Sequence, residues 1–421
     1  MVARLGPWQG VAVYVGSVLG PGVLVLPRLA ADAAGPASLV AWGLLLAFSV
    51  PVAATFAALG ARFPDGGGVS TFVRHAFGPR AAAAVGWWFY LAIPPGVVAG
   101  ALIGAGYVAG AAGFGGRGTL LVAVGLLAVA FAVNHRGLRL SGRAQLALTA
   151  LLVVLLVVAS VAAAGHLDAG NFTPFAPHGA AGVLDAVGVL FFAFLGWEAA
   201  SHLSAEFADP ARDLRRVTAG ALAVVAVLYL GLSIVSIGAL GEAAATEETP
   251  LAALLAIGLG PRTGWVTAAV ALVLSFGAIN AYIAGASRLG AALGRDRVFP
   301  AGLARGSLPG QVPHRSLAVL GGLTALALLG QALLGVGVEE LMRVTVGFLA
   351  AVTTLGCAAA IRLLPKGGGR RIAIVATAFS VVPLASVGWF LVFPAALAAV
   401  AWGRSRRLER DLAVADTREV Q

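Results

Sequence analysis

The sequence predicts an all-α, polytopic membrane protein with about 12 transmembrane helices, and three observations support this fold class. The chain has 421 residues, of which 60% are hydrophobic and only 11% are charged, and its mean hydropathy is +0.95. Apolar runs of about twenty residues, long enough to cross roughly 30 Å of hydrocarbon as a helix, recur along its whole length. The basic residues lie between these runs and are distributed very unevenly. This combination excludes an ordinary soluble domain.

The apolar runs are separated by short connections in which polar residues, glycine and proline recur. The first run is too long for a cleavable signal peptide and lacks a basic leader, so we expect it to remain as structure. Only a weak break near Val387 separates the last two runs. The twelve predicted spans cover approximately residues 9–33, 38–60, 81–111, 119–134, 144–165, 181–203, 216–240, 262–291, 317–336, 341–361, 371–387 and 388–403.

An even number of spans places both ends of the chain on the same side of the membrane. With these boundaries, all but four of the 28 basic residues lie on that side; the exceptions are Arg28, Arg117, Arg262 and Arg343. The positive-inside rule therefore predicts a multi-pass protein of the cytoplasmic membrane with both termini in the cytoplasm. The same distribution accounts for the net charge of +10, so we expect the lipid bilayer, and no nucleic acid, as the surrounding partner.

Two of the spans are interrupted near mid-depth. Gly20-Pro21-Gly22 divides the first span, and Gly196, followed two residues later by the ionisable Glu198, interrupts the sixth. Glycine and proline are the poorest helix formers, and lipid cannot satisfy broken backbone bonds. Interruptions at matching positions of two halves are typical of an inverted repeat built around a substrate site. The sequence therefore predicts that helices 1 and 6 are broken to form a binding site.

The spacing of the breaks divides the chain into two repeats of five spans within a single transmembrane domain. Because five is an odd number, the second repeat would enter the membrane in the opposite sense. We expect repeat one at about residues 9–165, repeat two at about 181–361, peripheral helices at about 371–403 and a cytoplasmic tail at 404–421.

The interruptions also supply binding groups. The half-helix that begins near Gly22 presents free N–H groups and the positive end of its dipole, which suit a carboxylate. The carbonyl groups before this break, and those near Leu195 and Gly196, can accept hydrogen bonds from an ammonium group. One pair of broken helices can therefore hold both ends of a zwitterion.

Six motifs occur in order along the chain and cover roughly residues 7–316. Two of them lie at the breaks, GPGVLVLP (20–27) in span one and FFAFLGWE (191–198) in span six. The others are PDGGGVSTFVRHAFG (64–78), NFTPFAPHG (171–179), EFADPARDLRR (206–216) and SRLGAALGRDRVFP (287–300). Together they resemble the amino acid–polyamine–organocation superfamily, whose signatures are G-[ST]-G-[IV]-F-x-x-P in span one and F-x-F-x-G-x-E in span six. The resemblance implies a secondary active transporter of amino acids that works by alternating access, not an enzyme.

Two stretches point to one branch of the superfamily. GWWFYLAIPPG (86–96) and LGWEAASHLSAEF (195–207) most resemble the bacterial exporters of methionine and branched-chain amino acids. That branch implies a small neutral, apolar amino acid as substrate (methionine, leucine, isoleucine or valine) and outward transport, as in an exporter or antiporter.

One departure from the family pattern concerns the carboxylate of the substrate. Where the family has Ser or Thr between the two glycines of span one, this chain has Pro21, which offers neither a hydroxyl nor an amide. The carboxylate would then depend on the amides of Gly20, Gly22 and Val23, aided by Ser17.

Apolar residues near the breaks are candidates for the wall of the cavity. We predict that Phe192 and Leu195 touch the substrate, whereas Trp197 suits a gate or packing as well as a wall. In span three, Ile93 and Val97 lie where members of the family line the cavity. Their apolar side chains argue against arginine or glutamate as the substrate, although a proline kink that only shapes the helix explains this segment equally well.

Four polar residues are candidates for coupling, gating or binding. Glu198 is the ionisable group predicted deepest in the membrane, where a functional role is the default and capping of broken backbone is the alternative. His202 lies four residues further on the same helical face and suits a proton relay or an interfacial position. Glu206 could pair with a loop arginine as a cytoplasmic gate, and protons are a candidate coupling partner. Asn280 in span eight suits substrate binding or, slightly better, an interhelical hydrogen bond.

The sequence contains no pattern typical of an enzyme or of a bound cofactor. The glycines at 66–68 lack the G-K-[ST] that would complete a phosphate-binding loop, and the lone Cys357 gives no disulfide framework and no cysteine metal site. The alternative function is proton-coupled amino acid uptake by the same fold. A channel or a non-transporting sensor is remote, because polar residues are sparse in the spans and no large soluble domain is present.

Overall fold

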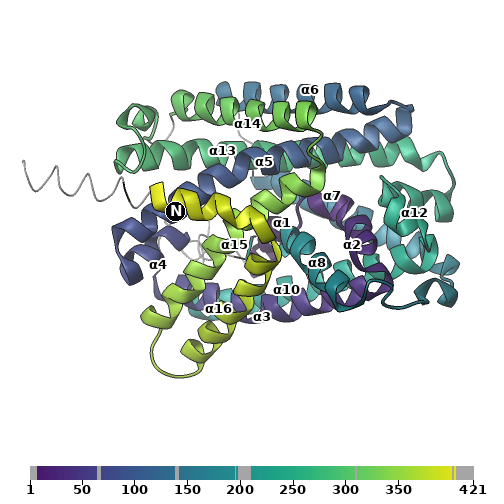
Figure 1. Cartoon of the computed structure of the whole chain (residues 1–421), viewed down its shortest axis with the longest axis horizontal. Helices are drawn as coiled ribbons and strands as arrows, with labels where there is room; N and C mark the ends of the chain where they lie inside the picture. Colours follow the sequence, from purple (N-terminus) through teal and green to yellow (C-terminus); the bar gives the residue numbers. More distant parts are fainter. Residues whose placement is uncertain are drawn as a thin grey trace, which may run out of the picture.

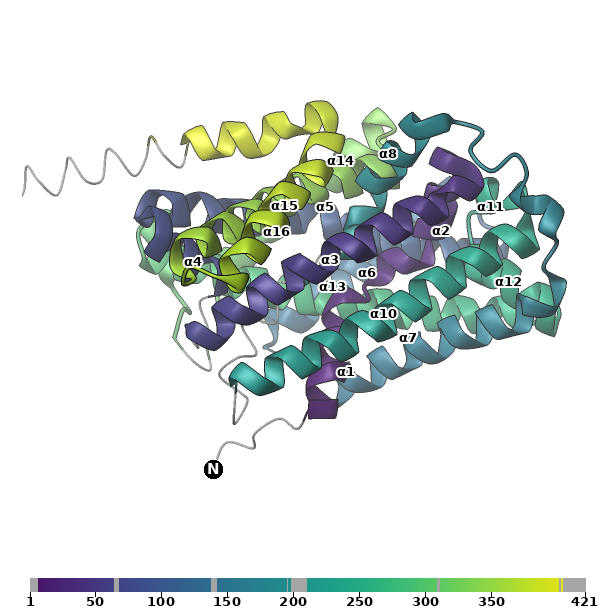
Figure 2. The same ribbon diagram turned by 90° about the horizontal axis from the view of Figure 1, so that it is seen from below.

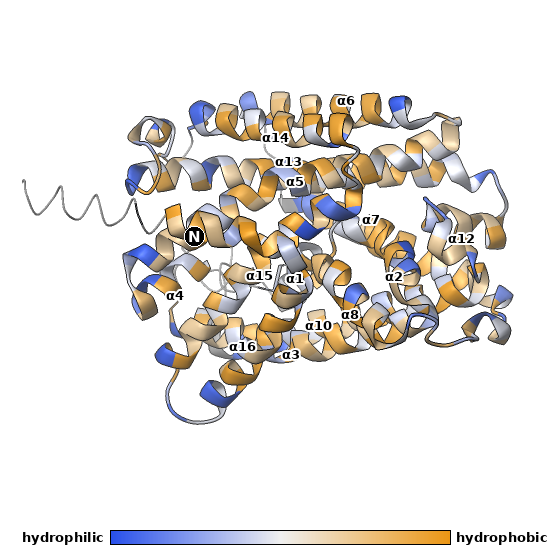
Figure 3. Ribbon diagram, viewed as in Figure 1, coloured by the Kyte–Doolittle hydropathy of each residue, from blue (hydrophilic) through white to orange (hydrophobic). Residues whose placement is uncertain are grey.

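The structure, a computed structural model, describes residues 7–63, 68–137, 142–194, 196–197, 210–308, 311–400 and 403. Within these ranges the chain is helical and contains no strand. The long helices cross the molecule in roughly the same direction (Figure 1), and hydrophilic residues gather at their ends while apolar residues cover their lengths (Figure 3). This is the arrangement of a multi-pass membrane protein.

The first five predicted spans correspond to six helices and one short 3-10 helix, with a further short helix, α4, between spans two and three. Span one consists of α1 and α2 with the 3-10 helix η1 between them. The bounds are α1 Pro7–Val18, η1 Pro21–Leu24, α2 Leu26–Ala34, α3 Ser38–Arg62, α4 Gly68–Phe77, α5 Pro79–Ala112, α6 Gly116–His135 and α7 Gly142–Ala163.

The second half of the chain follows the same plan, with α8 and the 3-10 helix η5 in the place of the broken first span. Two short helices, α11 and α12, connect spans seven and eight. The bounds are α8 Gly179–Leu190, η5 Phe191–Phe194, α10 Pro210–Leu240, α11 Ala243–Thr246, α12 Pro250–Leu259, α13 Thr263–Arg295, α14 His314–Leu334, α15 Val338–Leu363, α16 Gly368–Ser386 and η8 Gly388–Leu391.

The predicted pattern of about twelve spans is confirmed. In the described part of the chain, nine helical segments are long and apolar enough to cross a membrane, and the longest, Leu26–Arg62, contains the second half of span one and all of span two. Spans six and twelve correspond to the shorter apolar helices Gly179–Phe194 and Gly388–Val400. The short helices α4, α11 and α12 were not predicted, because each is too brief to show a clear apolar period.

Helix α5 is the central element, and it packs along both α13 and α15. It begins with Pro79 at its first position, where the missing N–H has no cost, and it ends at Gly113 in the left-handed conformation (φ 70°). The helix continues through Pro94 and Pro95 for a total of 34 residues. Neighbouring helices permit such prolines inside a membrane span, because they can satisfy the backbone groups that a proline leaves without a partner.

The outer helices present apolar side chains away from the core. Helices α6 and α14 lie side by side along one edge of the molecule (Figure 1), and the helix Gly388–Val400 lies at another edge (Figure 2). Leu121 of α6 is 71% exposed and Leu334 at the end of α14 is 79% exposed. Exposed leucines on these helices form the surface that faces lipid.

Candidate functional site

The first span is broken at the predicted Gly-Pro-Gly sequence. Helix α1 ends at Val18, Gly20 is extended (φ −95°, ψ 178°), and η1 begins at Pro21. The amide of Gly20 donates to the Val18 carbonyl oxygen (3.0 Å), and the amide of Val23 donates to the Gly20 carbonyl oxygen (3.3 Å). The amide of Gly22 lies in the first turn of η1, where a helix supplies no carbonyl partner. Of the three predicted carboxylate donors, Gly20 and Val23 already have backbone partners, and Gly22 is buried within the break.

The sixth span is broken directly beside the first. Helix α8 tightens into η5, and Gly196 then adopts a positive φ of 114°. A Cβ atom at Gly196 would lie against the carbonyl oxygen of Ser17, and a Cβ atom at Gly22 would lie 2.7 Å from Cδ1 of Phe192. Only glycine combines this backbone conformation with so close an approach. The two breaks therefore pack against each other through their glycines.

Three buried tyrosines bond the carbonyl groups that the breaks release. A backbone carbonyl without a partner inside a membrane costs several kcal/mol by rough estimate, so these hydrogen bonds stabilise the broken conformation. The donors come from α1, α10 and α5, which surround the breaks. The pairs are Tyr14 with the Trp197 carbonyl (2.7 Å), Tyr229 with the Ala193 carbonyl (3.0 Å) and Tyr107 with the Leu24 carbonyl (2.7 Å).

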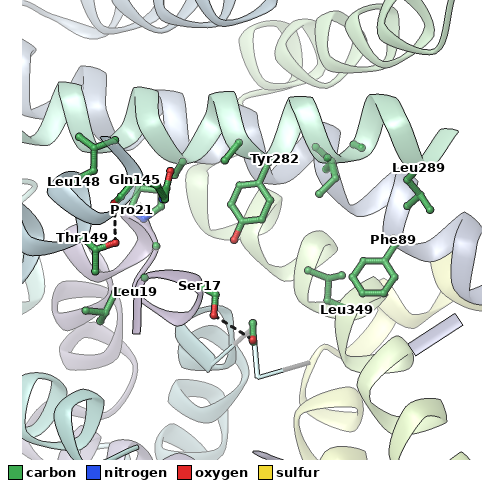
Figure 4. Close-up of a pocket in the computed structure, with 18 of the residues that line it drawn as sticks. Ser17, Leu19, Pro21, Phe89, Gln145, Leu148, Thr149, Tyr282, Leu289 and Leu349 are labelled. Atoms are coloured by element: carbon green, nitrogen blue, oxygen red, sulfur yellow. Dashed lines mark hydrogen bonds between the residues drawn. The ribbon is translucent and has the colours of Figure 1, made fainter. Parts of the chain in front are cut away.

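Ser17 links the two breaks on the side that faces the cavity. Its hydroxyl donates to the carbonyl oxygen of Tyr14 (2.7 Å) and lies 3.5 Å from the carbonyl oxygen of Gly196 (Figure 4). The side chain is half-buried. Ser17 therefore places a hydroxyl oxygen and the Gly196 carbonyl oxygen close together, as acceptors for a cationic group.

A cavity of about 590 Å³ lies beside the two breaks (Figure 4). Among the described residues that line it, none is charged. Its wall is mostly apolar, and its polar side chains are Ser17, Ser70, Gln145, Thr149 and Tyr282. The Tyr282 side chain extends from α13 into the cavity. The site is therefore an apolar chamber with a few hydroxyl and amide groups.

The cavity extends from the breaks toward the arginine-rich ends of the helices. Its lining includes Ser70 of α4, Gln145 near the start of α7 and Leu289 near the end of α13. Each of these segments borders a connection on the side that carries most of the basic residues. On the other side of the breaks, α2 packs against α8. The large cavity therefore lies on one side of the site only.

A smaller pocket of about 40 Å³ adjoins the large cavity. The two share Pro21, Ile93 and Tyr282 among their lining residues. Beyond these, the smaller pocket reaches Val97 of α5 and Phe192 of η5. Its lining is almost entirely apolar, which suits a hydrocarbon or thioether side chain.

Most of the predicted substrate-binding residues come together in these two spaces. They derive from spans one, three and six, as the sequence indicated. Ser17, Gly20, Pro21, Ile93 and Gly196 line the large cavity, and Val97 and Phe192 line the smaller pocket.

Trp197 and Asn280 are placed outside both linings, each for a clear physical reason. Trp197 is 2% exposed and packs edge-on against Tyr14, with ring centroids 5.4 Å apart. Asn280 is also 2% exposed and accepts a hydrogen bond from Nδ2 of Asn134 (2.7 Å), which joins α13 to α6. The packing interpretation of Trp197 and the interhelical interpretation of Asn280 therefore describe their positions.

Two further predicted residues, Gly22 and Val23, are buried within the break and do not line either space as described. Four others, Leu195, Glu198, His202 and Glu206, lie outside the described residues. Their predicted roles remain predictions.

Several lining residues were not predicted from the sequence. Tyr282 of α13 lines both spaces, and Thr149 and Gln145 of α7 are joined by a hydrogen bond from the threonine hydroxyl to the glutamine carbonyl (3.1 Å). A Cβ atom at Gly16 would collide with the Thr149 side chain, so α1 and α7 touch at this point. A usable signal was the scarcity of tyrosine: the chain has only five, and all fall inside predicted spans.

The broken helices, the cavity between them and the apolar outer surface define a membrane transporter. The chain belongs to the amino acid permease family, whose sequence model matches residues 5–411. It is 33% identical over 395 residues to the uncharacterized amino acid permease YecA of Bacillus subtilis, covering 94% of this chain and 93% of that protein. It is 32% identical over 405 residues to the L-methionine/branched-chain amino acid exporter YjeH of Escherichia coli, covering 95% of each.

A solved structure shares the fold. The crystal structure of MhsT in complex with L-phenylalanine superposes with a TM-score of 0.63 at 16% identity, and the match covers 93% of this chain and 100% of that one. The predicted fold class, with broken helices 1 and 6, is therefore confirmed.

Proposed function

We propose that this protein is a secondary carrier that exports neutral, apolar amino acids across the cytoplasmic membrane by alternating access. Its substrates are methionine, leucine, isoleucine and valine. The observation that carries the proposal is the cavity beside two broken helices, whose described lining residues carry no charge. The charged backbone groups of the substrate bind at the breaks, and its side chain enters the smaller apolar pocket.

The composition of the wall selects against charged side chains. Among the described lining residues, an arginine, lysine or glutamate side chain in this cavity would lose its water without meeting a partner of opposite charge. Such a loss costs several kcal/mol by rough estimate. A methionine or leucine side chain instead buries apolar surface, which contributes about 25 cal/mol per Å². This difference supports neutral, apolar substrates over charged ones.

The backbone groups exposed at the breaks suit an α-amino acid. Gly20 and Pro21 line the cavity at the start of η1, so a carboxylate placed against them lies at the positive end of this short helix. The carbonyl of Gly196 and the hydroxyl of Ser17, which lie 3.5 Å apart, can accept from the ammonium group. Both charged ends of one zwitterion would thus be held by groups that the helix breaks release.

The location of the cavity supports an inward-facing conformation. It lies on the arginine-rich side, which the positive-inside rule assigns to the cytoplasm together with both termini. A carrier in this form takes up its substrate from the cytoplasm, the first step of export. Outward transport is also what the name of the Escherichia coli relative describes.

Counterflow in proteoliposomes tests the proposal. Vesicles that contain the purified protein are preloaded with unlabelled methionine, leucine, arginine or glutamate, and the matching labelled amino acid is supplied outside. We expect labelled methionine and leucine to accumulate, and arginine and glutamate to give the background of protein-free vesicles. Exchange of arginine or glutamate at the rate of methionine would contradict the assignment of the cavity.

A matched variant connects exchange to the breaks. Gly20 is extended, lines both spaces and has nothing within 4 Å of an added Cβ, so Gly20→Val should fold while filling the binding position. We expect this variant to lose methionine exchange and to keep its thermal unfolding temperature.

The direction of transport is tested separately, by imposing proton gradients of either sign on methionine-loaded vesicles. Proton-driven accumulation into vesicles from the outer face would support uptake instead of export.

A further inference from the structure

One of the residues that line the smaller pocket is a glycine, Gly100, in the middle of α5. We propose that Gly100 is a specificity-determining residue: its missing side chain leaves the space that admits the longer apolar substrates. The proposal rests on the proposed function, because it assigns the smaller pocket to the substrate side chain. Gly100 lines that pocket together with Pro21 of the first break and Ile279 of α13.

The surroundings of Gly100 show that an added methyl group would fit without moving the backbone. A Cβ atom there would lie 3.5 Å from Cγ of Pro21, 3.6 Å from Cγ1 of Ile279 and 3.9 Å from its Cδ1. These are ordinary van der Waals distances. The methyl group would therefore occupy part of the pocket instead of forcing the helices apart.

The next glycine along α5 has a different environment, and the contrast is informative. At Gly104, a Cβ atom would lie 2.7 Å from both Cβ and Oγ of Ser275, so that glycine is required for close contact between α5 and α13. Gly104 does not line either space as described. Helix packing therefore explains Gly104, but it does not explain a glycine at position 100.

The pocket is small enough for one methyl group to matter. It measures about 40 Å³, and the side chains around it, including Val97 and Phe192, leave little freedom to compensate. One methylene more or less in an apolar pocket changes discrimination by about 10-fold or more. Gly100→Ala should therefore weaken methionine and leucine while leaving alanine, whose side chain does not reach position 100, nearly unchanged.

The test compares apparent affinities for methionine, leucine and alanine, measured by competition with labelled substrate in proteoliposomes. For Gly100→Ala we expect at least a roughly tenfold loss for methionine and leucine and less than a roughly threefold change for alanine. The control is Gly106→Ala in the same helix, where an added Cβ meets nothing within 4 Å and which lines neither space. That control should match the wild type for all three amino acids.

A second variant keeps the proposal falsifiable if the first is poorly folded. Ile279→Val removes the Cδ1 methyl, which lies 3.9 Å from the position of the added Cβ, so it should improve methionine relative to alanine and partly restore methionine binding in combination with Gly100→Ala. Equal losses for all three amino acids, or no loss in Gly100→Ala together with no gain in Ile279→Val, would overturn the proposal. If the wild type binds none of these amino acids, the proposed function itself fails, which is a distinct result.

Discussion

The two sides of the broken helices differ sharply in how they are closed. On the side with few basic residues, the guanidinium of Arg343 at the start of α15 bonds Asp185 of α8 (2.6 Å) and, through Nε, Glu339 one turn earlier (2.8 Å). Its side chain is only 12% exposed. On the arginine-rich side, the chain instead leaves a cavity of about 590 Å³ with no charged lining residue among those described.

The comparison separates the contacts that close one side of the site from the cavity that opens the other side. On the closed side, Arg343 joins α15 to α8 of the broken sixth span, and Tyr107 bonds the Leu24 carbonyl of the first break. On the open side, Tyr14 and Ser17 still join the first break to the sixth span, and the large cavity lies next to them. Access from one side at a time is what alternating access requires, and the closed side identifies the contacts that would have to separate when the cavity opens the other way.

The largest effect is expected from Gly196→Ala, which breaks the contact between the two interrupted helices. The backbone strain of a non-glycine residue at this φ costs about 1–3 kcal/mol, and the new Cβ would also collide with the Ser17 carbonyl. We expect the variant to be markedly less thermostable in detergent and inactive in exchange. Gly106→Ala, in a helical position with open space, is the control. A Gly196→Ala protein with wild-type stability and exchange would show that the breaks do not touch.

The next effect concerns the tyrosines. Tyr107→Phe removes the donor to the Leu24 carbonyl and should lower the free energy of unfolding by about 1–3 kcal/mol, because a buried acceptor loses its partner. Tyr90→Phe is a matched control, since Tyr90 also donates to a backbone carbonyl, that of Ser316 on α14, away from the breaks (2.9 Å).

Both variants should therefore lower the thermal unfolding temperature, but only Tyr107→Phe should also weaken methionine binding. Equal effects of the two variants on binding would mean that Tyr107 contributes to stability alone. The measurements are thermal unfolding in detergent and substrate competition in proteoliposomes.

The breaks could be predicted because their chemistry is local. Gly20, Pro21 and Gly22 interrupt a helix wherever they lie, and the length of the apolar run places them near mid-depth. Gly196 could be predicted in the same way, because it interrupts the sixth span at the position that matches the break in the first. The positions of the spans were equally accessible, since the distance across the hydrocarbon fixes the length of each helix.

The faces of the helices could not be predicted in the same way. Helices α5 and α13 are apolar nearly all round, so periodicity does not show which side borders the cavity. Tyr282 was therefore not predicted as a lining residue, although it lines both spaces. For the same reason Trp197, adjacent to a break in sequence, was a candidate wall residue, whereas its ring is buried against Tyr14 and lines neither space.

A moderate effect is expected from opening the closed side. Arg343→Gln removes the positive charge that pairs with both Asp185 and Glu339. If this weakens the closed side by about 1 kcal/mol, the population of molecules open to the outside rises about fivefold. A cysteine placed at Val97, in a protein whose own Cys357 is replaced by alanine, reports access to the smaller pocket.

We expect a membrane-impermeant thiol reagent added outside to label this cysteine about fivefold faster in the Arg343→Gln protein. Arg117→Gln, which removes an exposed charge from the same side, should leave the rate unchanged. Identical labelling rates with and without Arg343 would mean that packing alone closes this side.

The smallest expected effect tests the departure from the family pattern at Pro21. Pro21→Ser restores an amide and a hydroxyl at the first position of η1, on a residue that lines both spaces. Each additional hydrogen bond to the carboxylate contributes about 0.5–1.5 kcal/mol, so methionine should bind about two- to tenfold more tightly for each bond gained. Pro21→Ala, which restores the amide without the hydroxyl, separates the two donors. Unchanged affinity in both variants would place the carboxylate elsewhere, and a gain in Pro21→Ala equal to that in Pro21→Ser would assign the contact to the backbone alone.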